Sequence, residues 1–241
     1  MRVEGRNAVR ELILSGETID RVLIVDGNHD AVMNEIISLL KSKGVRFQFV
    51  KQVVLNNESV TKHHQGIIAY TTEFKYCATE DILEYAKSKN EDPFILILDG
   101  IEDPHNLGSI IRVCECLGVH GIIIEKTRAC QVNETVIKVS AGASSYVKVA
   151  RVSNINNEIE KLKKCGVWVY ACELGGEPLN KSNLKGSIAI VIGSEGKGTG
   201  KLTLKNCDGI VTIPQFGNVN SLNASVATGI VLYEVVTQRK D

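Results

Sequence analysis

The stretch that decides the fold is Ile213-Pro-Gln-Phe-Gly-Asn-Val-Asn-Ser-Leu-Asn-Ala-Ser-Val-Ala-Thr-Gly229. Pro214 ends an apolar strand, because it lacks the N–H group that a strand ladder requires. Gly217 and Asn218 then permit backbone angles that most residues avoid. The stretch therefore predicts a strand, a polar turn and a helix in succession.

The helix is expected to begin near Ser221. Helical spacing predicts one buried stripe, in which Ser225 and Gly229 would let another backbone approach closely. Ser221 and Asn223 fall in the expected first turn, where free N–H groups favour anionic or polar ligands. An ordinary helix capped by Ser221 or Asn220 explains the same residues. The full stripe is Leu222, Ser225, Val226, Gly229, Tyr233 and Val236.

An alternation of strands and helices precedes this stretch. The unbroken apolar run Phe94–Leu98 is typical of a strand buried on both faces of a parallel sheet. Ligands of such sheets bind outside the carboxyl ends of the strands. Further strands are expected at 121–124, 146–150, 167–171, 188–192 and 209–213, and helices at 107–117, 132–140 and 154–165.

The N-terminal part repeats the alternation on a smaller scale, with helices expected at 5–15 and 30–43 and strands at 22–25, 45–50 and 66–71. His63 and His64 precede the last strand, and we interpret them as structural. We therefore expect a small α/β domain over 1–72, a charged linker with a short helical pattern over 73–92, and a larger α/β domain over 93–241.

Composition limits the function classes. The 241 residues contain 28 Lys plus Arg and 28 Asp plus Glu, so a global basic field is absent. This balance does not favour nucleic-acid binding, although it leaves room for a local basic patch. No apolar run approaches the ~18 residues of a membrane span, and no signal peptide is recognisable. Seven cysteines without disulfide spacing favour the reducing cytoplasm. Cys114-x-Cys116 lacks partners at zinc spacing, so we expect no metal.

The first of three polar stretches at strand ends is Asp99–Arg112. Asp103-Pro104 begins a turn and Asn106 is a plausible helix cap. Gly108 and Arg112 share one helix face, where a long cation over a glycine could hold a phosphate or ribose. A surface arginine on an amphipathic helix is the plainer interpretation.

The second polar stretch is Ile192-Gly-Ser-Glu-Gly-Lys-Gly-Thr-Gly-Lys201. A Walker A motif would need glycine where Glu195 stands, and the glycine spacing does not fit G-x-G-x-x-G either. A flexible loop is possible, but Glu195 is an unusual residue at such a strand end. Three glycine-containing polar turns at the ends of strands of one sheet, the third being 213–229, favour a common ligand site.

Together these stretches resemble the three motifs of the SpoU (TrmH) branch of the SPOUT RNA methyltransferases. Asn106-Leu-Gly with Arg112 resembles the first motif, Ile192-Gly-Ser-Glu-Gly196 the second, and Ile213-Pro through Ser221-Leu-Asn-Ala-Ser225 the third. The segments Val3–Val9 and His64–Ala69 resemble longer members of the family that carry an extra N-terminal domain and methylate guanosine in 23S ribosomal RNA. The resemblance covers essentially the whole chain.

For the fold, the resemblance implies a C-terminal parallel-sheet domain threaded into a deep trefoil knot, an exception to the rule against knots. It also implies an N-terminal RNA-binding domain like a ribosomal protein, and a homodimer with active sites at the subunit interface. The implied reaction is transfer of a methyl group from S-adenosylmethionine to a ribose 2′-hydroxyl of RNA, without a metal or a membrane partner.

For the site, the resemblance implies two sets of residues. Arg112 is the proposed base in the family, but a guanidinium keeps its proton, so we favour stabilisation of a developing alkoxide. We expect Asn106 and Ser221 to orient the ribose, and Glu195 to order the loop or read the base. The catalytic set is Asn106, Arg112, Glu195, Ser221 and Asn223, and the cofactor-binding set is Gly193, Gly196, Ile213, Pro214 and Leu222.

Other functions remain open at this point. The N-terminal domain favours ribosomal over transfer RNA, although a transfer-RNA methyltransferase would carry the same motifs. A resistance-type methyltransferase acting on 23S RNA is a further relative. A non-catalytic RNA-binding or ribosome-assembly factor would keep the fold without the activity.

Overall fold

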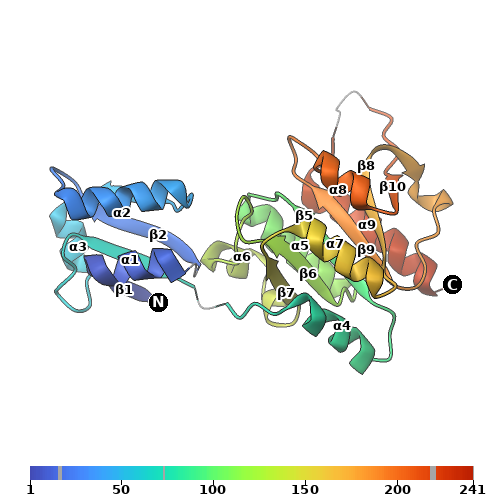
Figure 1. Ribbon diagram of the computed structural model, residues 1–241, viewed down its shortest axis with the longest axis horizontal. Coiled ribbons are helices and arrows are strands. Elements are labelled where there is room, and N and C mark those ends of the chain that lie inside the picture. Colours follow the sequence, from blue (N-terminus) through green and yellow to red (C-terminus); the bar gives the residue numbers. More distant parts are fainter. Residues whose placement is uncertain (16–17, 73, 218–220, 241) are drawn as a thin grey trace. The chain divides into compact units, whose positions relative to one another are not determined.

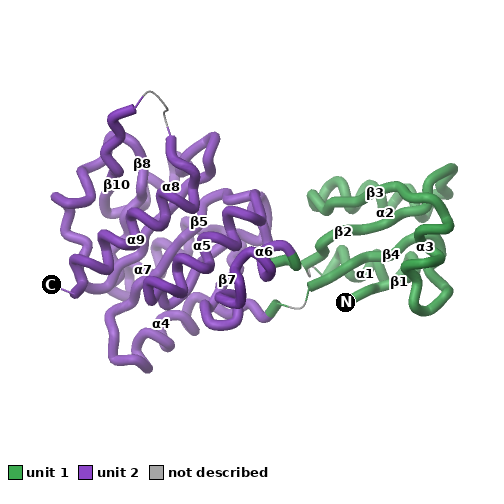
Figure 2. The backbone as a smooth tube through the Cα atoms, turned by 180° about the vertical axis from the view of Figure 1, so that it is seen from behind, with its two compact units in different colours: residues 1–74, 132–134 green, residues 75–131, 135–241 purple. Residues whose placement is uncertain are grey.

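The computed structural model of the chain describes residues 1–15, 18–72, 74–217 and 221–240. It forms two compact units, residues 1–74 with 132–134 and residues 75–131 with 135–241 (Figure 2). Asn218 and Asn220, which the sequence places in the turn before the last helix, lie outside the described residues.

The first unit, coloured blue to cyan in Figure 1, contains a four-stranded sheet of order β1-β4-β2-β3. Its β2 and β3 are parallel, and β4 is antiparallel to both β1 and β2. One face packs on two helices through a core that includes Val9, Met33, Ile36, Val22 and Ile24. The elements are β1 (Arg2–Glu4), α1 (Arg6–Ser15), β2 (Ile19–Val25), α2 (Ala31–Ser42), β3 (Phe47–Val50), α3 (Gln52–Glu58) and β4 (Ile67–Thr71).

The opposite face of this sheet is covered in part by α3, which the sequence pattern does not predict. Leu55 of α3 packs with Leu23, Ile68 and Tyr70 in a second, smaller cluster. The buried His64 accepts a hydrogen bond from the Gly66 N–H at 3.0 Å through Nδ1, which agrees with a structural role.

Glu4 fixes the loop that follows α3. Its carboxylate accepts hydrogen bonds from the Val60 N–H (2.6 Å), the Thr61 N–H (3.2 Å) and the hydroxyls of Ser59 (2.7 Å) and Thr61. Burial raises the pKa of this carboxyl, but the bonds from Thr61, Ser59 and Val60 outweigh burial and lower the pKa to about 2.

This lowered pKa predicts an acid-dependent loss of stability. A carboxyl with a folded pKa below its ordinary value stabilises the fold above that ordinary value, and the contribution disappears as the pH falls toward the folded pKa. We expect Glu4→Gln to lower the free energy of unfolding at pH 7 and to have progressively less effect between pH 4.5 and about 2. Urea unfolding across this range measures it, with Glu11→Gln on α1 as control. An effect independent of pH would contradict the role of the charge.

The second unit is a six-stranded sheet of order β10-β8-β9-β5-β6-β7 in which all neighbours are parallel. Ile95–Leu98 of the central strand β5 are fully buried, as the unbroken apolar run predicts. The predicted parallel α/β domain is therefore confirmed, whereas the trefoil knot stays a prediction. The strands are β5 (Phe94–Asp99), β6 (Gly121–Glu125), β7 (Lys148–Val152), β8 (Trp168–Pro178), β9 (Ile188–Gly193) and β10 (Gly209–Thr212).

Helices cover this sheet. Ile82 of α4, within the expected linker, packs into the same core as Ile155, Ile159 and Leu162 of α7, so this helix belongs to the second unit. Helices α5 and α9 pack against each other, and α9 also contacts β9. The helices are α4 (Thr79–Ser88), α5 (Pro104–Cys116), α6 (Glu134–Val139), α7 (Ile155–Lys164), α8 (Lys201–Asn206) and α9 (Ala224–Lys240).

The expected start and buried stripe of the last helix are wrong. Helix α9 begins at Ala224, not near Ser221. It buries Ala224, Thr228, Val231, Leu232 and Val235, while Leu222, Val226 and Tyr233 of the expected stripe are 36%, 50% and 65% exposed. Apolar residues occur on nearly every side of this helix, so the spacing fits more than one stripe and cannot select among them.

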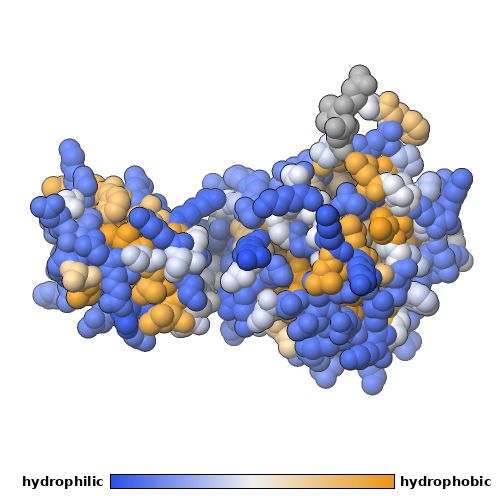
Figure 3. Space-filling view, turned by 45° about the horizontal axis from the view of Figure 1, so that its top comes forward, coloured by the Kyte–Doolittle hydropathy of each residue, from blue (hydrophilic) through white to orange (hydrophobic). Residues whose placement is uncertain are grey.

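On the face that Figure 3 shows, most side chains of both units are polar, with groups of apolar side chains between them. Within the described ranges, no helix has the length and apolar character needed to span a bilayer.

Candidate functional site

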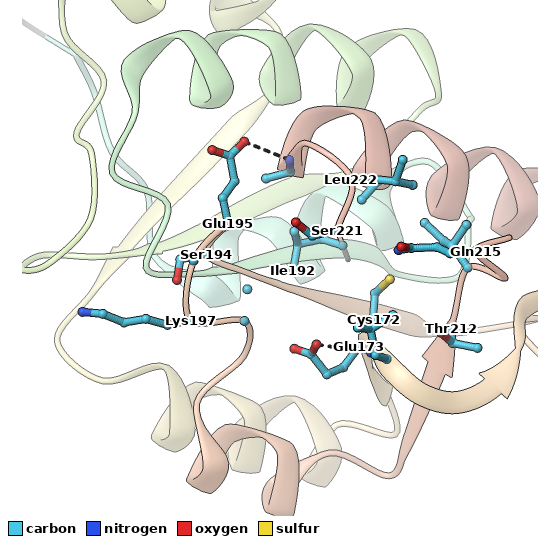
Figure 4. Close-up of a pocket in the computed structure, with 17 residues that line it drawn as sticks. Cys172, Glu173, Ile192, Ser194, Glu195, Lys197, Thr212, Gln215, Ser221 and Leu222 are labelled. Carbon is cyan, nitrogen blue, oxygen red and sulfur yellow. Dashed lines mark hydrogen bonds between the residues drawn. The ribbon is translucent and has the colours of Figure 1, made fainter. Parts of the chain in front are cut away.

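A cavity of about 360 Å³ lies where β9 and β10 end and α9 begins, beside the middle of β8 (Figure 4). Its volume is within the range of small-molecule sites, roughly 300–1,000 Å³. It lies beyond the carboxyl ends of parallel strands, where the ligands of open α/β sheets bind. The lining includes Cys172, Glu173, Ile192, Gly193, Ser194, Glu195, Gly196, Lys197, Thr212, Ile213, Gln215, Ser221 and Leu222.

Gly193 lets the loop after β9 fold back on itself. A Cβ at this position would lie 2.2 Å from both the Gly198 carbonyl carbon and the Thr199 nitrogen, so no other residue fits without backbone movement. The returning segment is closed by two hydrogen bonds between Ser194 and Gly198, at 2.9 and 3.2 Å. Gly196 differs, because a Cβ there meets nothing within 4 Å.

Glu195 joins the three polar stretches. Its Oε1 atom accepts hydrogen bonds from Asn106 Nδ2 at 2.9 Å, Asn223 Nδ2 at 2.5 Å and the Ala224 N–H at 3.2 Å. Figure 4 shows this carboxylate directed toward the start of α9. Asn223 Nδ2 also donates to Asn106 Oδ1 at 2.9 Å. The carboxylate therefore also places a negative charge at the N-terminus of α9, where the helix dipole favours it.

Asn223 caps α9 instead of lying in its first turn. Its Oδ1 accepts from the N–H groups of Ser225 (3.0 Å) and Val226 (3.3 Å) and from the Ser225 hydroxyl (2.6 Å). These donors fix which end of the amide carries the oxygen, so the Nδ2 group must face Glu195 and Asn106.

Asn106 is not a helix cap, in contrast to the expectation. Helix α5 begins at Pro104 and is capped by Asp103, which accepts from the His105 N–H at 3.1 Å. Asn106 lies within the first turn and is only 7% exposed. Proline is favoured at the first position of a helix and aspartate at the cap before it. Helix α5 therefore begins two residues before Asn106, the cap expected from the sequence.

Glu173 is a cavity residue that the sequence analysis missed. Its carboxylate accepts from the N–H groups of Thr199 at 2.9 Å and Leu174 at 3.2 Å, so it holds the returning loop from the side of β8. The adjacent Cys172 stays a neutral thiol at physiological pH, because burial and then the charge of Glu173 raise its pKa to about 11. In the sequence, the available signal for Glu173 was its position shortly after the apolar run 167–171.

Five predicted residues besides Glu195 line the cavity: Gly193, Gly196, Ile213, Ser221 and Leu222. Pro214 is not among the lining residues, although its neighbours Ile213 and Gln215 are.

Arg112 lies elsewhere. Its side chain is exposed in a separate hollow of about 490 Å³ lined by Ser109, Arg112, Val113, Cys116, Leu117, Gly229 and Tyr233. Gly108 does not form a notch beside it, because a Cβ there would lie 2.7 Å from Val139 Cβ, so this glycine serves close packing. The structure thus separates Arg112 from the Glu195 cluster of its own chain.

Among the described residues, no three His, Cys, Asp or Glu side chains are grouped closely enough to hold a metal ion. Cys114 is fully buried and Cys116 is exposed, so the two sulfurs of the Cys-x-Cys pair face different surroundings.

Two family models match the chain. Residues 93–233 match the SpoU rRNA Methylase family, and residues 2–77 match the RNA 2′-O ribose methyltransferase substrate-binding family. The chain is 40% identical over 239 residues to a putative TrmH family tRNA/rRNA methyltransferase, YacO, of Bacillus subtilis, with 98% of this chain and 95% of that one covered.

Solved structures share the fold. The SpoU methyltransferase AviRb of Streptomyces viridochromogenes, in complex with AdoMet, matches with a TM-score of 0.61 and 22% identity over 99% of this chain and 90% of that one. An AdoMet-bound rRNA methyltransferase of Sinorhizobium meliloti matches with a TM-score of 0.59 and 21% identity over 97% and 85% of the two chains. With both family models and a relative at 40% identity over nearly its whole length, this chain belongs to the SpoU/TrmH family of RNA methyltransferases.

Proposed function

We propose that this chain methylates the ribose 2′-hydroxyl of a guanosine in 23S ribosomal RNA, in the cytoplasm, with S-adenosylmethionine as the methyl donor. The observation that carries the proposal is the Glu195 cluster, which joins the loop after β9, the first turn of α5 and the start of α9 beside a cavity of small-molecule size. The substrate-binding family match of residues 2–77 supports RNA as the substrate.

The cavity fits the donor by its chemistry. Apolar side chains of Ile192, Ile213 and Leu222 suit an adenine ring, and the carboxylates of Glu173 and Glu195 suit cationic groups. S-adenosylmethionine, when bound, supplies a methyl group on a sulfonium that is already a strong electrophile. The protein therefore has to position and activate the ribose oxygen, which would bond to the methyl carbon as the carbon–sulfur bond breaks, with the hydroxyl proton passing to water.

The geometry supports a different role for each of three predicted catalytic residues. Asn106 is buried and uses both ends of its amide within the Glu195 cluster, so we assign it to holding Glu195 and no longer to the ribose. Ser221 is exposed at the cavity and is placed to contact the ribose. Arg112 stabilises negative charge on the ribose oxygen through its guanidinium.

Arg112 can perform this role if it comes from a second copy of the chain. It borders a hollow between α5 and α9 and lies outside the lining of the cavity. Val226, Ile230 and Tyr233 on α9 are 50%, 41% and 65% exposed, an apolar face of the kind that subunit interfaces cover. We propose a homodimer in which this face is buried and Arg112 of each subunit serves the cavity of the other.

Three measurements test the proposed function. Calorimetry with S-adenosylmethionine should show binding, and transfer of a labelled methyl group to total RNA should follow. Mapping of 2′-O-methyl sites in cells with and without the protein should place the lost site at a guanosine of 23S RNA. A lost site in transfer RNA would favour the alternative substrate, and binding without transfer would favour a non-catalytic factor.

Glu195→Ala is expected to weaken cofactor binding by about tenfold, because the loop and the start of α9 lose their common acceptor, each such charged hydrogen bond contributing roughly 1.5–3 kcal/mol. The buried Asn106 amide also loses an acceptor, so the free energy of unfolding should fall. Calorimetry with S-adenosylmethionine and urea unfolding measure the two effects. Glu115→Ala, on the exposed side of α5, is the control, and reduced RNA affinity with normal cofactor affinity would instead favour base reading.

A further inference from the structure

Four polar side chains lie in one row across the sheet of the first unit. Arg2 of β1 pairs with Tyr70 of β4, and Tyr70 pairs with Arg21 of β2. The Val22 N–H donates to the Arg46 carbonyl at 3.0 Å, and Val22 pairs with Phe47, so Arg46 continues β3 beside Arg21. We call Arg2, Arg21 and Arg46 with the central Tyr70 the arginine row.

The row lies on the face opposite α1 and α2. Val45 and Phe47 both pack against the core under α1 and α2, so the intervening Arg46 points to the other face. The Arg21 guanidinium carbon lies 4.3 Å from the centre of the Tyr70 ring, and Tyr70 belongs to the cluster beneath α3. Arg21 and Arg46 are both exposed.

The charges in the row are not balanced. Arg2 forms an ion pair with Glu58 at 3.3 Å, and the Tyr70 hydroxyl donates to the same carboxylate at 2.7 Å. A second carboxylate nearby, that of Glu4 on β1, already accepts hydrogen bonds from the loop after α3. Among residues 1–15, 18–72, 74–217 and 221–240, neither Arg21 nor Arg46 forms an ion pair.

Two unpaired arginines on neighbouring strands repel each other, which destabilises the free protein. A bound anion removes the repulsion. Tyr70 holds the Arg21 guanidinium flat, so less freedom is lost when its planar fork binds the oxygens of a phosphate. The chain as a whole has no net charge, so it cannot attract a polyanion through its overall field. Binding of a polyanion therefore requires a local group of positive charges such as Arg21 and Arg46.

We propose that the arginine row binds the sugar-phosphate backbone of the RNA substrate, with Arg21 and Arg46 on phosphates and Tyr70 and Arg2 as their support. This assignment rests on the proposed function for the identity of the RNA. The contacts carry no sequence information and position the RNA for a site elsewhere on the enzyme.

The test is the double variant Arg21→Gln with Arg46→Gln in the full chain. The probe is fluorescently labelled, unmodified 23S ribosomal RNA transcribed in vitro, with a transfer-RNA transcript as second probe. Each lost phosphate contact should lower the slope of log affinity against log salt by about 0.7–0.9, so the slope should fall by about 1.5 and affinity should drop on the order of tenfold at 150 mM salt. S-adenosylmethionine binding should be unchanged.

The matched control is the double variant Lys41→Gln with Lys43→Gln, which removes the same amount of positive charge from the end of α2. It should leave the slope of log affinity against log salt closer to the wild-type value. Arg21→Lys with Arg46→Lys should keep most of the slope, which separates a charge effect from misfolding of the sheet. The proposal is overturned if the double Gln variant binds both RNA probes with the affinity and the salt dependence of the wild type. In that case the arginine row either binds an acidic protein or binds nothing. Failure of the wild type to methylate 23S RNA, with the slope effect intact, would count against the proposed substrate alone.

Discussion

Arg112→Ala is expected to reduce methyl transfer to RNA by about 10²–10³-fold, the usual cost of removing a group that stabilises charge in a transition state. Cofactor affinity should be unchanged, because Arg112 is assigned to the ribose oxygen and not to the cofactor, and it does not line the cavity of its own chain. The exposed side chain contributes little to folding, so the melting temperature should also be unchanged. Single-turnover transfer of a labelled methyl group and calorimetry measure the two quantities.

Arg112→Lys tests the kind of contact. A lysine keeps the charge but not the planar fork, so we expect an intermediate loss of about tenfold. Full activity of Arg112→Lys with normal cofactor binding would mean that the fork geometry is not used.

Mixed dimers test the origin of Arg112. A dimer of one Arg112→Ala subunit and one Gly193→Ala subunit, purified through two different tags, contains one intact site if Arg112 serves the partner's cavity. It should then show about half of the wild-type activity, because one of two equivalent sites of a symmetric dimer is complete. If Arg112 serves its own chain, neither site is complete and the mixed dimer should be as inactive as either parent.

Gly193→Ala is expected to abolish measurable binding of S-adenosylmethionine. The added methyl group would lie 2.2 Å from backbone atoms of Gly198 and Thr199, which no rotation of a side chain can relieve. The returning segment has to move away from Glu173, and Glu195 in the same loop has to shift with it. Overpacking of this kind costs roughly 1–3 kcal/mol or more of unfolding free energy. Calorimetry and urea unfolding measure the two losses.

Gly196→Ala is the matched control for stability. It adds the same methyl group three residues further along the same loop, where nothing lies within 4 Å. Its free energy of unfolding should equal or slightly exceed that of the wild type, since alanine reduces the freedom of the unfolded chain. Normal cofactor binding by Gly193→Ala would show that the loop can open without cost.

Much of the second unit could be predicted from the sequence because its strands are buried on both faces. Runs such as Phe94–Leu98 and Ile188–Ile192 contain no alternation that could be misread, and both are central strands. The convergence of Glu195 and Asn223 followed from the rule that parallel strands present their carboxyl ends at one edge. Short or amphipathic elements such as β1, α3 and α8 were missed, since three to seven residues give too little periodicity.

The remaining features depend on pairing that a linear sequence does not contain. The arginine row requires the register of four strands, with residues 2, 21, 46 and 70 brought into line. The role of Gly193 requires the return of residues 198 and 199 toward it. The buried side of α9 depends on where α5 and β9 lie, because its own residues are apolar on several sides.

The cluster around Glu195 has a consequence for the order of folding. Its contacts join Asn106 to Glu195 across 89 positions of the chain and to Asn223 across 117. Closing loops of this length costs entropy before the hydrogen bonds form, so such contacts are made after the local helices, together with the equally distant pairing of β5 with β9. A refolding population should therefore regain its helical content first and its capacity for catalysis last, with a native-looking but inactive species between them.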